Sequence, residues 1–288
     1  MVLDITDIPF LPIQLFRNNE VKTLKFDPQK IFESSGTTST TTSRHFVKDI
    51  GLYKESFIRA FELFYGDPSG YCIIGLLPSY LERNNSSLVF MVQELITQSQ
   101  HGLSGFYLDD HEKLYHTLLH NEIAQKKTLL IGVTFALIDF ALQYKMNLAN
   151  TIIMETGGMK GRLPELTRAE VHTILKDKLS IGHVHSEYGM TELLSQAYAR
   201  KNGIFKCPPW MLVLIRGEDD PLLVQTPPIS KKHVTGVINI IDLANLYSCA
   251  FLATDDIGSL HHDGTFEVLG RTDASDLRGC SLLTMQQL

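Results

Sequence analysis

Continuous runs of apolar residues, each followed by a stretch with helical periodicity, occupy the middle of the chain. Such runs are typical of strands buried on both faces of a parallel sheet, because the intervening helices cover that sheet. The pattern therefore predicts βαβ units. The expected strands and their following helices are residues 71–77 with 86–99, 128–133 with 136–145, and 151–154 with 169–179.

Local signals refine this prediction near the third helix. Thr167 stands before its first residue and Glu170 three positions later, which is the pattern of a capping box. Beyond it, we expect a strand over residues 181–184 and the start of a helix just after Glu192.

After residue 206 the pattern changes to short β-rich runs at 211–215, 236–241 and 266–269, separated by Gly, Pro and Asp. Such runs predict a terminal β-rich subdomain. Two domains are therefore expected: an α/β core over residues 1–206, and a β-rich subdomain with a short C-terminal tail over 207–288. Within the second, Asp263-Gly264 favours a β-hairpin turn over a metal site built on the adjacent histidines.

Composition narrows the function classes. Apolar residues make up 44% and charged residues 20%, as in ordinary globular proteins. The net charge of −6 argues against nucleic-acid binding. The N-terminus has no pattern of a signal peptide, and no apolar run is long enough to span a membrane. With four scattered cysteines, we expect a cytoplasmic protein with reduced, buried thiols at Cys72 and Cys249.

A hydroxyl-rich loop is the first candidate site. It runs through Ser34, Ser35, Gly36, Thr37 and Thr38. Small residues offer hydroxyls and approachable backbone N–H groups to phosphate oxygens, and glycine permits the positive φ that a backbone nest needs. The alternative is a Ser/Thr-rich linker.

The segment Tyr188-Gly189-Met190-Thr191-Glu192 is the second candidate site. A carboxylate beside a hydroxyl provides a hard oxygen ligand for the Mg²⁺ of a nucleotide and a donor for its phosphate. A Thr-Glu pair alone would more often be a helix cap.

Three further candidates lie along the chain. Gly157 and Gly158 follow an expected strand, although many loops between a strand and a helix begin with glycines. Asp256 stands in Thr254-Asp255-Asp256-Ile257-Gly258, and Arg271 follows in Gly270-Arg271-Thr272-Asp273. Cys280 lies beside a cation, which favours a thiolate.

In this order and spacing, these segments resemble the nucleotide-handling motifs of the adenylate-forming enzymes, which join a carboxylic acid to AMP with ATP. The resemblance implies an α/β fold of the adenylate-forming N-terminal-domain type, with βαβ layers and a terminal β-rich subdomain but without the full mobile C-terminal domain. It also implies ATP and Mg²⁺ as cofactors.

The resemblance also assigns roles to residues. It implies that the loop from Ser34 to Thr38 binds phosphates, and that Glu192 holds the metal while Thr191 contacts the α-phosphate. Tyr188 with Gly189, and Gly157 with Gly158, would line the adenine. Asp256 would bind the ribose, and Arg271 the ribose or a phosphate.

Within this superfamily the chain is most similar to the acyl-protein synthetase of the bacterial luminescence fatty-acid reductase complex. The likeness includes residues 8–12, 156–160 and 186–192, with Leu277-Arg278-Gly279-Cys280. It implies that a fatty acid is activated and transferred to Cys280, with a reductase or acceptor protein as partner. A ligase acting on coenzyme A or a carrier thiol, and a non-catalytic nucleotide- or acyl-binding subunit, remain alternatives.

The sequence departs from the family pattern in the phosphate loop. Ser39 stands where a second glycine is usual, and the lysine that follows is missing. Arg44 is the nearest cation and would meet the β- or γ-phosphate in its place. The resemblance also implies a lysine from the mobile C-terminal domain in adenylation, and without that domain Lys160, Arg44 or a partner protein would compensate. We expect the acid pocket at residues 132–137, since apolar groups suit an acyl chain.

Overall fold

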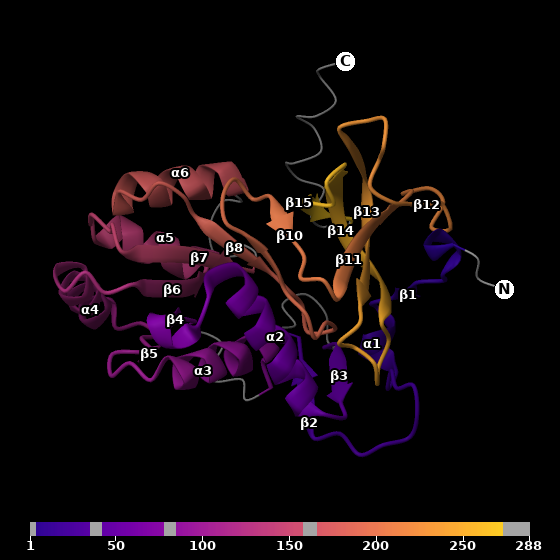
Figure 1. Cartoon of the computed structure of the whole chain (residues 1–288), viewed down its shortest axis with the longest axis horizontal. Coiled ribbons are helices and arrows are strands. Elements are labelled where there is room, and N and C mark those ends of the chain that lie inside the picture. The colour runs from indigo at the N-terminus through magenta and orange to yellow at the C-terminus, as the bar shows by residue number, and fades with distance from the viewer. Residues whose placement is uncertain (1–3, 35–41, 78–84, 158–165, 273–288) are drawn as a thin grey trace. The chain divides into compact units, whose positions relative to one another are not determined.

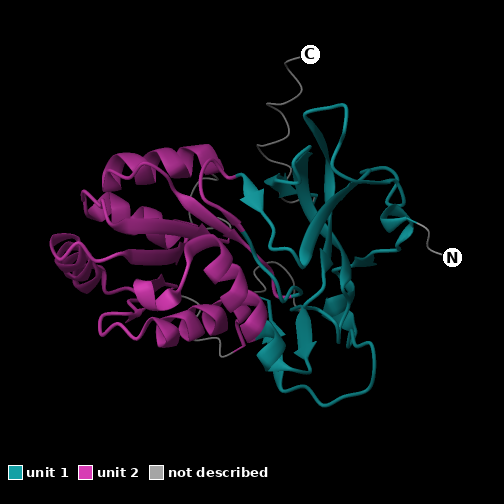
Figure 2. Cartoon of the chain, viewed as in Figure 1, with its two compact units in different colours: residues 1–53, 192–197, 204–288 teal, residues 54–191, 198–203 magenta. Residues whose placement is uncertain are grey.

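The computed structural model describes residues 4–34, 42–77, 85–157 and 166–272. The chain forms two compact units, each built from separate stretches of sequence (Figure 2). Unit 1 comprises Met1–Tyr53, Glu192–Ala197 and Ile204–Leu288, and unit 2 comprises Lys54–Thr191 and Tyr198–Gly203. The domain boundary predicted between residues 206 and 207 stays a prediction.

Unit 2 contains a parallel sheet, as the apolar runs predicted. Its strands lie in the order β5-β4-β6-β7-β8, and each neighbouring pair is parallel. Every residue of β4 and of β6 is buried, which explains why their sequences lack polar alternation. The strands are β4 (Cys72–Leu76), β5 (Gly105–Phe106), β6 (Thr128–Val133), β7 (Thr151–Thr156) and β8 (His185–Tyr188).

Helices cover both faces of this sheet. Figure 1 shows α5 and α6 on one side of the strands and α3 on the other. Ser86 caps α3, and the capping box of Thr167 and Glu170 at the start of α6 is confirmed. The helices are α2 (Ile50–Tyr65, which begins in unit 1), η2 (Pro68–Gly70), α3 (Ser87–Ser99), α4 (His111–Ile123), α5 (Thr134–Gln143) and α6 (Arg168–Leu179).

Two expectations near the second motif were wrong. The strand lies at His185–Tyr188 rather than 181–184. Its residues Ser186 and Glu187 are buried because β8 pairs with β7 and their side chains bond to those of Glu155 and Thr156. No helix follows Glu192. Instead, the backbone N–H groups of Leu194 and Ser195 donate to the carboxylate of Asp242, and the chain stays irregular until β9 (Ala197–Ala199).

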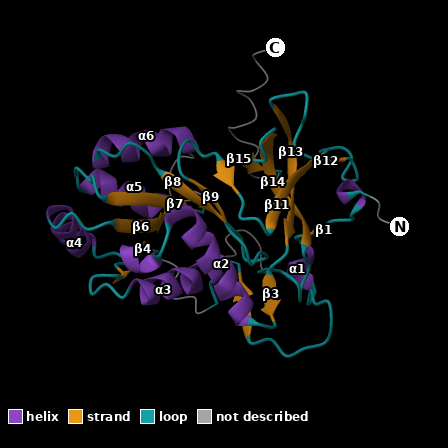
Figure 3. Ribbon diagram, in the orientation of Figure 1, coloured by secondary structure: helices purple, strands orange, loops and turns teal. Residues whose placement is uncertain are grey.

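Unit 1 is rich in strands (Figure 3). Its sheet has the order β12-β11-β13-β14-β15-β10, with antiparallel neighbours, and β1 pairs with β14 in parallel. β2 and β3 form a separate antiparallel pair. The elements are η1 (Ile5–Asp7), β1 (Leu11–Pro12), α1 (Leu15–Asn18), β2 (Lys30–Glu33), β3 (Arg44–Val47), β10 (Phe205–Lys206), β11 (Met211–Arg216), β12 (Val224–Gln225), β13 (His233–Asp242), β14 (Phe251–His261) and β15 (Phe266–Arg271).

The β-rich runs predicted after residue 206 are thus confirmed as strands, and so is the hairpin turn between β14 and β15. Gly264 in that turn has φ +80°, a conformation that favours glycine. His261 bonds to Glu267 across the hairpin at 3.1 Å.

The cysteine expectation is confirmed for Cys72, which is free and buried, whereas Cys249 is free and half-buried. Within the described ranges, the helices are all too short or too polar to cross a bilayer.

Candidate functional site

The base of the predicted phosphate loop is closed by two serines of unit 1. The N–H of Ser34 donates to the carbonyl oxygen of Ser43 at 3.0 Å, and the N–H of Ser43 donates to Oγ of Ser34 at 2.9 Å. Ser34 follows β2 and Ser43 precedes β3, so the pairing of these strands brings the two ends of the loop together. The other loop residues, Ser35, Gly36, Thr37 and Thr38, lie outside the described residues.

Glu192 lies beside this loop base. Its side chain is only 6% exposed and accepts a hydrogen bond from the side chain of Ser43. Burial raises the pKa of Glu192 above its usual value, and the Ser43 bond with the charges of Arg271 and Arg17 opposes that rise. The structure therefore joins the ends of the loop to a buried carboxylate whose favourable contacts only partly offset the cost of burying its charge.

Asp256 and Arg271 form the next part of the unit 1 site. They are paired residues on the antiparallel strands β14 and β15, and Nε of Arg271 lies 3.3 Å from Oδ1 of Asp256. Asp255, on the opposite face of β14, accepts a hydrogen bond from the side chain of Gln14. Asp255 therefore has a structural partner, and the sequence did not indicate this contact.

The arginines of unit 1 differ in their surroundings. Arg44 begins β3 and is exposed, with its guanidinium 5.5 Å from the ring centroid of Phe46. Arg17, on α1, is half-buried and near enough to Glu192 for its charge to act on that carboxylate. Arg17 was missed at the sequence level because it lies 17 positions before Ser34, outside any motif.

The predicted adenine-binding residues belong to unit 2. Gly157 directly follows β7, with φ +72°, and Tyr188 is the buried last residue of β8. Since Thr156 pairs with Glu187, Gly157 and Tyr188 leave neighbouring parallel strands at the same edge. Ligand sites of open α/β sheets lie at such carboxyl ends.

The chain continues from Tyr188 through an exposed Gly189 to a half-buried Thr191, where the first stretch of unit 2 ends. Gly158 and Lys160 lie outside the described residues, and so does Cys280.

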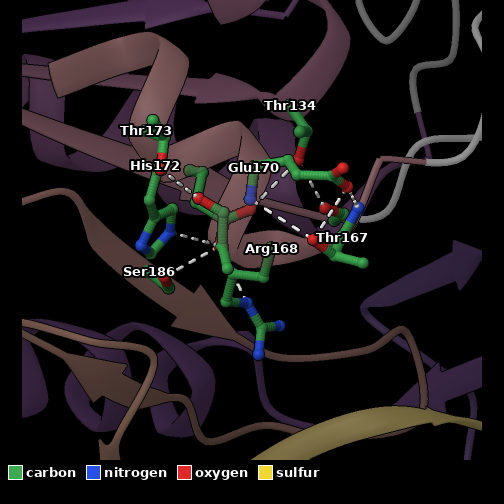
Figure 4. A network of polar contacts seen from close by, with 10 residues as sticks. Thr134, Thr167, Arg168, Glu170, His172, Thr173 and Ser186 are labelled. Carbon is green, nitrogen blue, oxygen red and sulfur yellow. Dashed lines mark hydrogen bonds and ion pairs between the residues drawn. The ribbon is translucent and has the colours of Figure 1, made fainter. Parts of the chain in front are cut away.

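A buried carboxylate anchors the turn at Gly157. Figure 4 labels the residues whose side chains bond to it, which are Thr134, Arg168, His172 and Ser186. Glu155, on β7, accepts bonds from Ser186 at 2.8 Å and Arg168 at 3.2 Å, and its Oε1 lies 3.4 Å from Nε2 of His172. Burial would raise the pKa of Glu155, but the His172 bond and the Arg168 charge outweigh it, so the pKa is lowered.

Thr134 connects Glu155 to that turn. Its hydroxyl lies 3.0 Å from both Oε2 of Glu155 and the carbonyl oxygen of Gly157. The charged network therefore fixes the first residue of the predicted adenine turn. It went unrecognised in the sequence because its members are spread over β7, α5, α6 and β8.

The predicted acid-pocket segment, residues 132–137, lies at the end of β6 and the start of α5. A Cβ atom on Gly132 would come within 2.9 Å of Leu137, so this backbone packs closely against its own helix. Its role in acid binding stays a prediction. Within the described part of the chain, no group of three or more His, Cys, Asp or Glu side chains could hold a metal ion.

Comparisons with known proteins identify the fold. No protein-family model matches the sequence, and no curated protein matches it. Among solved structures, the chain is similar to O-succinylbenzoate coenzyme A synthetase from Bacillus subtilis in complex with ATP and a magnesium ion. The TM-score is 0.58 at 17% identity, over 84% of this chain and 49% of that chain.

Two other enzymes are similar. A luciferase-like enzyme from the mealworm Zophobas morio gives a TM-score of 0.52 at 18% identity, over 85% of this chain and 57% of that one. The amide bond synthetase from Marinactinospora thermotolerans gives 0.53 at 14% identity, over 81% and 47%. This chain thus spans about half the length of these adenylate-forming enzymes and shares the fold of their N-terminal domain.

Proposed function

We propose that this protein uses MgATP to activate a carboxylic acid as an acyl-adenylate and then passes the acyl group to a thiol. One observation carries the proposal: in unit 1, Ser43 at the base of the hydroxyl-rich loop bonds to Glu192, and Arg271, which pairs with Asp256, is near enough for its charge to act on that carboxylate. The chain has the fold of O-succinylbenzoate coenzyme A synthetase, an enzyme solved both with ATP and magnesium and with its acyl-adenylate intermediate. We assign it to the same superfamily.

In unit 1, the loop from Ser34 to Thr38 would donate to the phosphates and Asp256 would accept from the ribose hydroxyls. In unit 2, Gly157, Gly158, Tyr188 and Gly189 would line the adenine. The Glu155 network supports the last role, because it fixes the Gly157 carbonyl through Thr134.

The residues near Glu192 suit a magnesium ion. Mg²⁺ prefers hard oxygen ligands and is commonly held by one or two carboxylates together with substrate phosphates. A buried carboxylate whose pKa is raised gains from a nearby cation. Glu192 would hold the ion and Thr191 would contact the α-phosphate; when bound, the ion neutralises phosphate charge.

Positive charge for the phosphates would come from arginines. Arg44 lies next to the loop base, and Arg271 contacts Asp256 with its Nε. We add Arg17 to these, because it is half-buried and acts on the same carboxylate as Arg271. Arginine keeps its charge and can bind phosphate oxygens in pairs. Lys160 remains a further candidate.

In the first step, a carboxylate oxygen of the acid attacks the α-phosphorus in line. The new bond joins that oxygen to phosphorus, while the bond to the bridging oxygen breaks and pyrophosphate leaves with the electron pair. The protein contributes by positioning the reactants and neutralising charge. In the second step, a thiolate attacks the acyl carbon and AMP leaves, forming a thioester.

The first step is tested by ATP–pyrophosphate exchange with Mg²⁺ across short branched, aryl and long fatty acids. Exchange stimulated by one class of acid would support adenylation and identify the substrate class, for which we propose a fatty acid. Absence of exchange with every acid, from protein shown to be folded, would contradict the proposal and favour a nucleotide- or acyl-binding subunit.

The second step is tested at Cys280. We propose that this thiol accepts the acyl group before a reductase or other acceptor protein receives it. The Cys280→Ser variant is expected to form acyl-AMP at the wild-type rate but to gain no thiol-linked acyl mass, as measured by intact-protein mass spectrometry before and after hydroxylamine. An unchanged adduct would exclude Cys280, and product formed only with coenzyme A would favour an acyl- or aryl-CoA ligase.

A further inference from the structure

The segment after Glu192 is buried yet forms neither helix nor strand. Leu193 and Ser195 are fully buried, and Leu194 is 4% exposed. Buried backbone N–H and C=O groups outside a helix or sheet need other hydrogen-bond partners. The partners of this segment therefore determine where the Glu192 carboxylate is held.

Asp242, the last residue of β13, is the first of these partners. Its Oδ2 accepts from the N–H groups of Leu194 at 2.8 Å and Ser195 at 3.1 Å. Its Oδ1 accepts from the Ser195 hydroxyl at 2.5 Å and from the N–H of Ala244 at 3.1 Å. One fully buried carboxylate thus fixes two consecutive residues that follow Glu192.

Asn245 is the second partner, in the turn after β13. Its Nδ2 donates to the main-chain oxygen of Glu192 at 2.8 Å, and Nε2 of His45 donates to its Oδ1 at 3.1 Å. His45 is itself 1% exposed and packs edge-on against Phe16. The side chain that holds the Glu192 carbonyl is therefore fixed on its other side.

We infer that Asn245, supported by Asp242, is a positioning residue that sets the Glu192 carboxylate for the magnesium ion of the nucleotide; this rests on the proposed function. Both act through the backbone: Asn245 holds the Glu192 carbonyl, and Asp242 holds the next residues. The Glu192 side chain is bonded by Ser43 from the loop base. A ligand fixed in this way binds the ion without first being ordered.

Isothermal titration calorimetry without acid substrate tests this inference. The affinity for ATP is measured in Mg²⁺ and in EDTA, and the ratio gives the gain due to the metal. Asn245→Ala and the isosteric Asn245→Asp are expected to reduce this gain by about 10- to 100-fold, as supporting residues of metal ligands do, with the affinity in EDTA unchanged. The matched control is Asn121→Ala, a buried asparagine of unit 2 bonded to Thr128, which is expected to keep the wild-type gain.

A merely structural role would reduce the folded fraction and leave the metal-dependent gain per folded molecule unchanged, and that result overturns the inference. Where an Asn245 variant does not fold, Ser195→Ala replaces it, because this change removes one hydroxyl and no backbone bond. A metal-dependent gain equal to that of the wild type in every folded variant would contradict the inference. Wild-type protein with no ATP binding in Mg²⁺ would overturn the proposed function and the inference together. A wild-type metal-dependent gain retained by the variants would overturn the inference alone.

Discussion

Replacing Glu192 with glutamine is expected to slow ATP–pyrophosphate exchange by about a hundredfold, the usual cost of one lost charge contact in a transition state. Glutamine keeps the size of the side chain and removes the charge proposed to hold magnesium. Because burial already disfavours that charge, the variant is expected to be at least as stable as the wild type. The measurements are exchange rates at saturating acid and a urea denaturation curve.

The control for this prediction makes the same change elsewhere. Glu122→Gln alters a carboxylate of unit 2 that accepts bonds from the backbone of Ala149 and Asn150 and from the Thr151 hydroxyl. It is expected to lower stability and to leave the exchange rate per folded molecule unchanged. A wild-type rate of ATP–pyrophosphate exchange in the Glu192→Gln variant would contradict the assignment of Glu192 as the magnesium ligand.

The sequence predicted the parallel sheet well because its strands are buried on both faces. β6 and β7 begin at the expected residues, and every residue of β6 is buried, so apolar content alone locates the strand. β8 was displaced in the prediction because its buried residues are polar. Ser186 and Glu187 are satisfied by Glu155 and Thr156 from the neighbouring strand, and such partners cannot be read from local periodicity.

In the candidate site, too, the sequence indicated individual residues but not their distant partners. The motifs singled out Glu192, Asp256 and Arg271 as candidates, and the pairing of the last two is an outcome of strand register. What holds Glu192 was not predictable, because its partners lie far away in sequence: Asn245 is 53 positions from it. Long-range hydrogen bonds depend on the tertiary fold, whereas the motifs report local chemistry.

A second large effect is expected from Glu187→Gln, in the pH dependence of stability. Glu187 is buried on β8 and accepts a hydrogen bond from the Thr156 hydroxyl at 2.5 Å. Burial raises the pKa of Glu187 to about 7 from the ordinary 4.5; the Thr156 bond opposes this rise and the nearby Glu155 charge adds to it. Glutamine keeps an acceptor for Thr156 and does not titrate.

The sign follows from proton binding. Between about pH 4.5 and 7, folded Glu187 keeps a proton that the unfolded chain has lost, so its contribution to stability falls as the pH rises and is constant above 7. Over that window the loss amounts to about 3 kcal/mol, at 1.36 kcal/mol per pKa unit. Relative to the wild type, the variant is therefore expected to gain about 3 kcal/mol between pH 4.5 and 7.5.

The quantity to compare is the difference in the free energy of unfolding between the wild type and the Glu187→Gln variant, because the contribution of His185 changes with pH in the opposite direction. Burial lowers the pKa of His185 to about 4, and the charges of Arg200 and His183 add to that, so its contribution to stability rises with pH between about 4 and 6.5. Both proteins contain His185, and subtraction removes its effect. Urea denaturation of each at pH 5, 6, 7 and 8 gives the comparison. Parallel curves of stability against pH would mean that Glu187 is ionised throughout, with a cation or water beside it in solution.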